Sequence, residues 1–119
     1  MPIQFSNDNP IFMQLANMIK SDIISEKFKP NDKLPSVREF ALEFGVNPNT
    51  VQKALQLLED DGLITTDRTN GKFVANNPNK IKTQKDKIIN EEMRVFVEKM
   101  QGFGLSMKEI KELINNLGE

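Results

Sequence analysis

Cysteine and histidine are both missing from the 119-residue sequence. Without cysteine the chain has no disulfide and no thiolate site, and without either residue the usual zinc sites and histidine-based nucleophiles cannot be built. The remaining residues assemble no catalytic constellation, so we expect no enzyme activity, no metal and no cofactor. The lack of cysteine also fits a cytoplasmic location.

Long hydrophobic runs are missing as well. No stretch of about 18 apolar residues is present, so the sequence predicts no membrane span. Residues 1–8 have neither the basic region nor the apolar core of a signal peptide. We therefore expect no membrane partner.

The sequence also lacks an excess of positive charge. Residues 1–75 carry 8 Lys/Arg and 10 Asp/Glu, and residues 76–119 carry 8 and 7. A nucleic-acid partner would therefore have to meet basic residues gathered on one face, because the bulk charge offers no attraction.

Capping motifs predict where four helices begin. Two are Asn-Pro pairs, with an N-cap acceptor before a proline at the first helical position. Two are Ser-x-x-Glu capping boxes. The four starts are Asn9-Pro10, Ser36–Glu39, Asn47-Pro48 and Ser106–Glu109. The first helix should end near Phe28, before Pro30, with Ile11, Leu15, Met18, Ile19 and Ile23 on one face.

The middle of the chain predicts two short helices joined by a tight turn at Gly45, the residue best suited to a left-handed conformation. Gly62 should end the second of these two helices, which starts at Asn47-Pro48, in a Schellman closure with Leu63 against Leu58. Helical spacing places these apolar residues in the core: Val37, Phe40, Ala41, Phe44, Val51, Ala54, Leu55 and Leu58. This arrangement is typical of a helix-turn-helix, whose second helix enters the DNA major groove.

The exposed face of the second helix is rich in amides, namely Asn49, Gln52 and Gln56, with Lys53 beside them. Such a face can be ordinary solvated surface. Asn and Gln can also read adenine in the major groove, whereas Lys53 is better suited to a phosphate.

A hairpin follows the second helix. Residues 63–66 and 72–75 are short strand candidates, and the segment between them contains Asn70-Gly71, a strong hairpin signal. Arg68 and Lys72 place two cations on this wing. They can be ordinary hairpin residues, but minor-groove or backbone contact is the favoured interpretation.

Residues 76–79 form a polar break, which we take as a domain boundary. Beyond it, apolar residues recur every three or four positions in two helices and form heptad-like seams. The predicted dimerisation residues are Ile89, Met93, Phe96, Met100, Phe103, Met107, Ile110, Ile114 and Leu117. This hairpin can fold back on its own chain, but a second copy is the simplest partner, which predicts a homodimer.

The predicted fold is mostly α with a small β-hairpin. A winged helix-turn-helix spans residues 8–76, and a two-helix dimerisation hairpin spans residues 77–119. Adjacent carboxylates at Asp60-Asp61 and Glu91-Glu92 raise the question of acid–base chemistry or magnesium binding. Neighbours in a helix point about 100° apart, so solvated surface is the favoured interpretation.

Several short motifs resemble the DNA-binding domain of GntR-type bacterial transcription regulators. They are Leu34-Pro-Ser, Arg38-Glu, Gly45-Val, Thr50-Val, Ala54-Leu, Leu58-Glu, Gly62-Leu-Ile and Gly71-x-Phe-Val. The short tail and residues 46–53 look most like the YtrA-like branch of that family. The resemblance implies a two-helix dimerisation module and, often, repression of a transporter operon.

The resemblance also implies roles for single residues. Arg38 matches a family arginine that contacts DNA, and Asn49, Thr50 and Gln52 match polar contacts at the start of the recognition helix. Gly71 matches the glycine at the wing tip. Two residues depart from the pattern, because many members have arginine at Pro48 and glycine at Thr69.

Together these observations predict a sequence-specific DNA-binding repressor that binds an inverted-repeat operator in double-stranded DNA as a homodimer. The candidate DNA-binding residues are Ser36, Arg38, Asn47, Pro48, Asn49, Thr50, Gln52, Lys53, Gln56, Arg68, Asn70, Gly71 and Lys72. A winged helix that serves as a protein–protein adaptor is the alternative, and it would account for the near-neutral charge. The sequence does not indicate an effector ligand.

Overall fold

A computed structural model describes residues 5–7 and 9–118. The chain divides into two compact units that part between Lys82 and Thr83. The predicted domain limits at residues 8 and 119, and most of the segment that was assessed for a signal peptide, lie outside the described residues.

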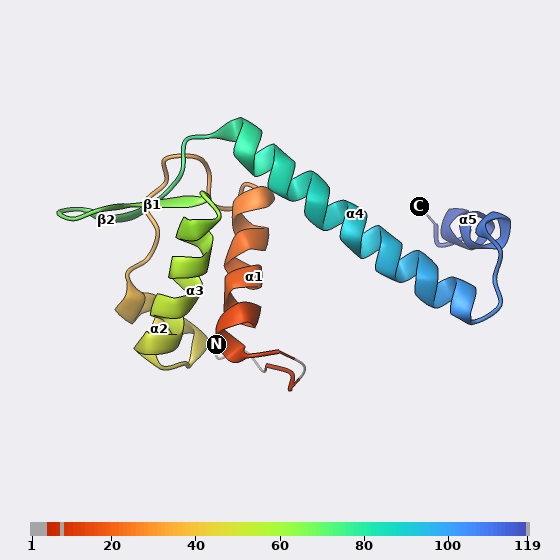
Figure 1. Ribbon diagram of the computed structural model, residues 1–119, viewed down its shortest axis with the longest axis horizontal. Helices are drawn as coiled ribbons and strands as arrows, with labels where there is room; N and C mark the ends of the chain where they lie inside the picture. Colours follow the sequence, from red (N-terminus) through yellow and green to blue (C-terminus); the bar gives the residue numbers. More distant parts are fainter. Residues whose placement is uncertain (1–4, 8, 119) are drawn as a thin grey trace. The chain divides into compact units, whose positions relative to one another are not determined.

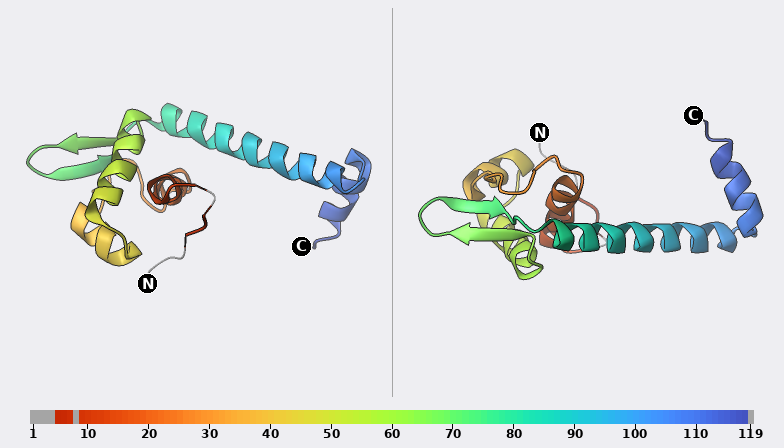
Figure 2. Two further views of the ribbon diagram at one scale, coloured as in Figure 1. Left: turned by 60° about the horizontal axis from the view of Figure 1, so that its bottom comes forward. Right: turned by 90° about the horizontal axis from the view of Figure 1, so that it is seen from above.

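The first unit is a helical core closed by a two-stranded sheet (Figure 1). Its elements are α1 (Ile11–Ile24), α2 (Val37–Phe44), α3 (Pro48–Asp60), β1 (Ile64–Asp67) and β2 (Gly71–Val74). Helices α1 and α3 lie side by side and make the main contact of the unit, and α2 packs against α3. The antiparallel strands pair Ile64 with Val74 and Asp67 with Gly71, so the hairpin projects from the helices as a wing (Figure 2).

The start and end of α1 differ from the prediction. The helix begins at Ile11, with Pro10 as its N-cap and no side-chain cap from Asn9. The amide of Gln14 instead donates to the carbonyls of Asn9 (2.6 Å) and Ser6 (2.9 Å), which fixes the segment before the helix. At the other end α1 stops at Ile24 rather than near Phe28, because Glu26 adopts a left-handed φ of 66°.

The core of α1 is also narrower than predicted. Leu15, Ile19 and Ile23 are buried, and Met18 packs at the edge of the core. Ile11, in the first turn of the helix, is 46% exposed.

The helix-turn-helix is confirmed. Both halves of the capping box form: the Glu39 N–H donates to Ser36 Oγ, and the Ser36 N–H donates to the Glu39 carboxylate. Gly45 ends α2 in the left-handed conformation at φ 70°. Asn47 caps α3, as its side-chain oxygen accepts the Asn49 N–H at 2.7 Å. All three devices are local, since each joins residues within four positions along the chain.

The buried face of the helix-turn-helix is also as predicted. Phe40, Ala41 and Phe44 of α2 and Val51, Ala54, Leu55 and Leu58 of α3 are buried, and Val37 packs against them. The strands begin one residue from their predicted positions, at Ile64 and Gly71.

Gly62 closes α3 in a Schellman motif. The Leu63 N–H donates to the Leu58 carbonyl at 2.9 Å, and the Gly62 N–H donates to the Glu59 carbonyl at 2.9 Å. The φ of Gly62 is 78°, and a Cβ there would lie 2.9 Å from Lys80 Cε. The positive φ therefore favours glycine at this position, and the Lys80 side chain would have to move to admit a Cβ.

We expect Gly62→Ala to lower the free energy of unfolding by about 1–2 kcal/mol, since alanine is strained in the left-handed region. Gly102→Ala is the control, because Gly102 ends α4 without a positive φ and a Cβ there meets nothing within 4 Å. That control should be neutral or stabilising by about 0.4–1 kcal/mol. Urea denaturation measures both, and equal effects would contradict the assignment.

Helix α4 (Pro78–Gly102) starts within the first unit. Asn77 Oδ1 accepts the Lys80 N–H at 3.1 Å, so Asn77-Pro78 is a helix start that the sequence analysis treated only as a polar break. Ile81, in the first turn of α4, belongs to the buried core of the winged helix. The first compact unit thus extends past the predicted boundary at residue 76.

The second unit comprises the rest of α4 and α5 (Met107–Asn115). The turn between them is closed by the Leu105 N–H, which donates to the Met100 carbonyl, and by Gly104 at φ 92°. The predicted capping box of Ser106 and Glu109 opens α5. Residues 5–7 and 9–118 thus contain five helices and one small hairpin, which confirms a mostly α fold with a winged helix.

Candidate nucleic-acid interface

The outer face of α3 carries Asn49, Gln52, Lys53 and Gln56, all exposed, opposite the buried face of the same helix. Within the described part of the chain, the side-chain amides of Asn49 and Gln52 make no hydrogen bond. An amide that presents a donor and an acceptor without an intramolecular partner can pair with a base edge. These two residues therefore form the available polar part of the face.

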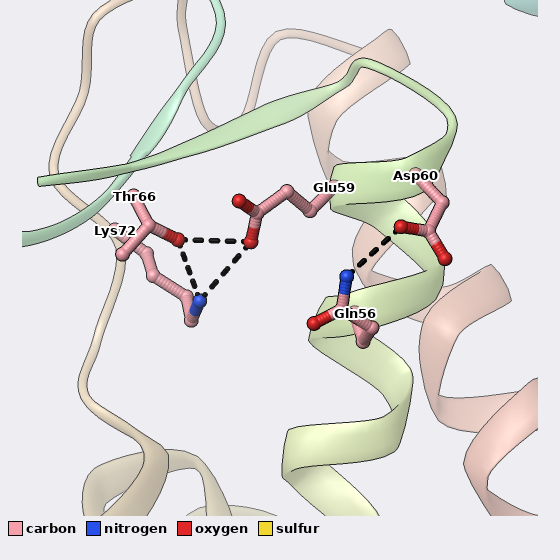
Figure 3. A network of polar contacts seen from close by, with 5 residues as sticks. All are labelled: Gln56, Glu59, Asp60, Thr66 and Lys72. Atoms are coloured by element: carbon pink, nitrogen blue, oxygen red, sulfur yellow. Dashed lines mark hydrogen bonds and ion pairs between the residues drawn. The ribbon is translucent and has the colours of Figure 1, made fainter.

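Other candidates on α3 have partners within the chain. The acceptor oxygen of Asn47 is used by its cap, and Pro48 occupies the first helical position. Lys53 Nζ lies 5.7 Å from the centre of the Phe12 ring of α1, within the range of a cation–π contact. The amide of Gln56 donates to Asp60 Oδ1 at 2.9 Å (Figure 3). These contacts orient Lys53 and Gln56, but each side chain keeps further hydrogen-bonding groups that the contacts do not use.

Helix α2 places Arg38 at the surface, one residue after the helix start. Arg38 forms no ion pair with Glu39 or Glu43, or with any other described residue. The backbone and side-chain hydrogen bonds from Ser36 lower the pKa of Glu39, so this carboxylate belongs to the cap. The guanidinium of Arg38 is left available to a phosphate or a base.

The wing tip is formed by residues 68–70 between the paired residues Asp67 and Gly71. Asp67 Oδ1 accepts the backbone N–H groups of Thr69 (2.9 Å) and Asn70 (3.3 Å), and its other oxygen accepts the Asn70 side chain. These bonds, the one from Thr69 first, lower the pKa of Asp67. The turn keeps this support above the usual carboxyl pKa and loses it as the pH falls through the lowered value.

This turn changes what the predicted wing residues do. Gly71 is paired in the ladder at φ 104° and is not the tip itself. Asn70 is folded onto Asp67, whereas Arg68 is exposed and makes no ion pair among the described residues. Arg68 is thus the cation that the tip presents.

Lys72 lies in a closed triangle of polar contacts (Figure 3). Its ammonium donates to Thr66 Oγ1 at 2.7 Å and lies 3.3 Å from Glu59 Oε1, and the Thr66 hydroxyl donates to the same carboxylate oxygen at 2.9 Å. Lys72 is therefore engaged with the end of α3 rather than directed away from the wing.

The sequence analysis missed Lys33. The segment before α2 runs along β2: Lys33 pairs with Phe73 across an isolated bridge, and the Leu34 N–H donates to the Lys72 carbonyl. An open cleft of about 460 Å³ lies between this segment, the start of α2 and the wing, and Lys33 and Arg68 both line it. A lysine directly before the Leu-Pro-Ser motif was the available signal, but only the fold brings it to the wing.

In the second unit, apolar side chains are exposed along both helices. The exposed members are Ile89, Met93, Val95, Phe96, Phe103, Met107, Leu113, Ile114 and Leu117. Of the predicted dimerisation residues, Ile110 alone is buried and Met100 is half-buried. An open apolar groove of about 250 Å³ lies over Ile110, lined by Phe96, Met100, Leu105, Ile110, Leu113, Ile114 and Leu117.

The adjacent carboxylates are engaged separately. Asp61 pairs with Lys20 of α1 at 3.4 Å, which ties α1 to α3. Glu91 and Glu98 both bind Arg94, and the hydrogen bond from Arg94 lowers the pKa of Glu91. Among the described residues no three Asp or Glu side chains group as metal ligands. None of the described helices is long and apolar enough to cross a membrane.

The profile described as "Bacterial regulatory proteins, gntR family" matches residues 13–74, which is more than half of the chain and covers the helix-turn-helix and the wing. The chain belongs to this GntR family. It is a transcriptional regulator with a DNA-binding domain rather than an enzyme.

Relatives similar over nearly the whole chain place this GntR protein in the YtrA-like branch. The regulator YhcF of Bacillus subtilis is 37% identical, with 98% of this chain and 96% of YhcF covered. The transcriptional repressor YtrA of the same organism is 32% identical, with 93% and 86% covered.

Solved structures agree with the fold. A GntR family regulator from Listeria monocytogenes superimposes with a TM-score of 0.88 at 29% identity, over 94% of this chain and 98% of that one. The DNA-binding domain of AraR in complex with operator ORX1 gives a TM-score of 0.58 at 29% identity, over 63% of this chain and 95% of that one.

Two residues set this GntR protein apart from the pattern its family implies. Pro48 occupies the first position of α3, so the recognition helix has no arginine there. Thr69 is in the wing turn, where its N–H binds Asp67 without a positive φ. The wing therefore closes without the glycine that many members have at this position.

Proposed function

We propose that this GntR protein binds an inverted-repeat operator as a homodimer in the cytoplasm and represses transcription, with a transporter operon as the expected target. The observation that carries the proposal is a set of polar groups at the turn that pair with no other described residue: the amides of Asn49 and Gln52 and the guanidinium of Arg38. The operator complex of AraR and the repressor YtrA support it as relatives.

Base reading is assigned to the start of α3. Asn49 and Gln52 lie in its first two turns, where recognition helices concentrate their base contacts, and Thr50 is half-buried beside them. Because Pro48 offers no donor, discrimination at the first base step has to come from Asn49 and Gln52. The amide groups favour adenine at the contacted positions.

Affinity is assigned to the cations around the cleft. Arg38, Lys33 and Arg68 are exposed on α2, the preceding segment and the wing tip, and the latter two line the same cleft. Ser36 and Asn47 support these groups through their caps. Lys53 and Gln56 contribute through the hydrogen-bonding groups that their contacts with Phe12 and Asp60 do not use. Phosphate contacts of this kind hold the helix in the groove without reading sequence.

The homodimer is supported by the exposed apolar side chains of the second unit. A monomer rarely leaves so many large apolar residues exposed along two helices. A second copy would cover the groove over Ile110 and would place two recognition helices on one duplex.

Selection from randomised duplexes tests the proposal. The unaltered chain should recover an inverted repeat with half-site centres about 10 bp or a multiple apart. Gln52→Ala should lose preference at one base step in each half-site, about 1–3 kcal/mol of discrimination. Arg68→Ala is the matched control, which should weaken every duplex alike. Recovery of no palindrome, or of binding that ignores salt, would favour the protein–protein adaptor.

A further inference from the structure

The cation of the wing nearest the recognition helix is held within the protein. Lys72 of β2 donates to Thr66 of β1 and pairs with Glu59 in the last turn of α3, at 2.7 and 3.3 Å. The Thr66 hydroxyl completes the triangle by donating to Glu59. The Thr66 hydroxyl uses its one donor, and the Lys72 ammonium uses two of its three donors. The three side chains therefore hold one another in place.

From this geometry we infer that Glu59 and Lys72 form a brace that positions the wing against α3, and that Glu59 keeps Lys72 off the DNA phosphates. The inference rests on the DNA binding proposed above. Lys72 thereby becomes a positioning residue, whereas the sequence analysis predicted a DNA contact. Arg68 and Lys33 then carry the charge of the wing side.

Burial and charge both support the brace. The Lys72 side chain is 22% exposed and that of Glu59 is 34% exposed, so the pair is partly shielded from solvent. If Lys72 moved to a phosphate, it would break its bond to Thr66 and leave an unpaired carboxylate close to the polyanion. The Glu59 carboxylate and the phosphates carry like charges and repel each other, so moving Lys72 from Glu59 to a phosphate opposes DNA binding.

The inference predicts an unusual salt dependence of DNA binding. Each phosphate contact adds about 0.9 to the slope of log K against log salt concentration. K72M should leave this slope unchanged, whereas R68M should reduce it by about 0.9 for each bound subunit. E59Q should release Lys72 to the DNA and steepen the slope by about 0.9 per subunit.

The experiment measures binding to a mixed-sequence duplex by fluorescence anisotropy over a range of salt concentrations. E59Q is also made in the K72M background, where the steepening should vanish, because it depends on the released lysine. E43Q removes an exposed carboxylate of α2 that makes no ion pair with any described residue, and it should not change the slope. Circular dichroism of each variant verifies the fold.

Opposite outcomes would overturn the inference. A slope lowered by about 0.9 in K72M would show that Lys72 already binds phosphate. An E59Q slope that is unchanged, or that steepens equally in the K72M background, would show that Glu59 restrains no cation. Failure of the unaltered chain to bind any duplex would instead overturn the proposed function, and the brace with it.

Discussion

Phe40→Ala is expected to lower the free energy of unfolding of the winged helix by about 3–5 kcal/mol. Phe40 is 2% exposed and stacks on Phe44, with ring centres 5.8 Å apart and planes at 22°. A helix of eight residues has too few backbone bonds to persist without such packing. The truncation should therefore leave a cavity and detach α2 from α3, as measured by urea denaturation followed by circular dichroism.

Leu42→Ala is the matched control for this change. Leu42 lies on the same helix but is 77% exposed, so its truncation should stay within about 0.5 kcal/mol. Because α2 carries Arg38 and the turn to the recognition helix, Phe40→Ala should also abolish duplex binding near its lowered unfolding midpoint. Equal effects of the two substitutions would contradict the packing described for α2.

The local signals of the helix-turn-helix were readable from the sequence because their causes lie within four residues. The capping box at Ser36, the left-handed Gly45 and the cap at Asn47 each depend on one side chain and its neighbouring backbone. The spacing of buried residues on α3 follows from helix geometry alone. The sequence therefore predicted the turn between α2 and the recognition helix α3, including the residues that cap it.

An Asn-Pro pair did not predict every helix start correctly, because tertiary contacts also determine where a helix begins. Asn9-Pro10 and Asn77-Pro78 are identical pairs, yet Asn9 does not make the cap that was predicted for it, whereas Asn77 makes a cap that was not predicted. Before α1, the side chain of Gln14 binds the Asn9 carbonyl and fixes the approach. Before α4, the helix start is held by Ile81 in the core, which no local pattern reveals.

The partners of the polar site residues were equally beyond the sequence. Glu59 and Lys72 lie 13 positions apart, and Lys33 reaches the wing only because its segment pairs with β2. Sequence spacing placed Lys53 on the exposed face but could not show Phe12 beneath its ammonium. Residue type thus predicted which side chains could bind DNA, whereas the fold determines which of them are unpaired.

A charged substitution in the apolar groove of the second unit is expected to have the other large effect. We expect Ile114→Glu to convert the proposed homodimer into monomers and to weaken operator binding by about 10²-fold or more. Ile114 lines the apolar groove, where a partner would bury the new carboxylate at a cost of several kcal/mol. Loss of the second copy also removes the high effective concentration of the second recognition helix. Analytical ultracentrifugation measures the mass, and titration of the selected duplex measures the affinity.

Asn115→Glu is the control that distinguishes disruption of the interface from the general effect of an added negative charge. It adds the same charge one position along α5, at an exposed residue outside the groove, and should preserve both the dimer and its affinity. Ile114 is itself 41% exposed, so a glutamate there can reach solvent in the single chain and its helix should persist. If Ile114→Glu remained dimeric, the groove would not be the interface. If it became monomeric with unchanged operator affinity, each winged helix would bind DNA independently, and an inverted repeat would confer no advantage.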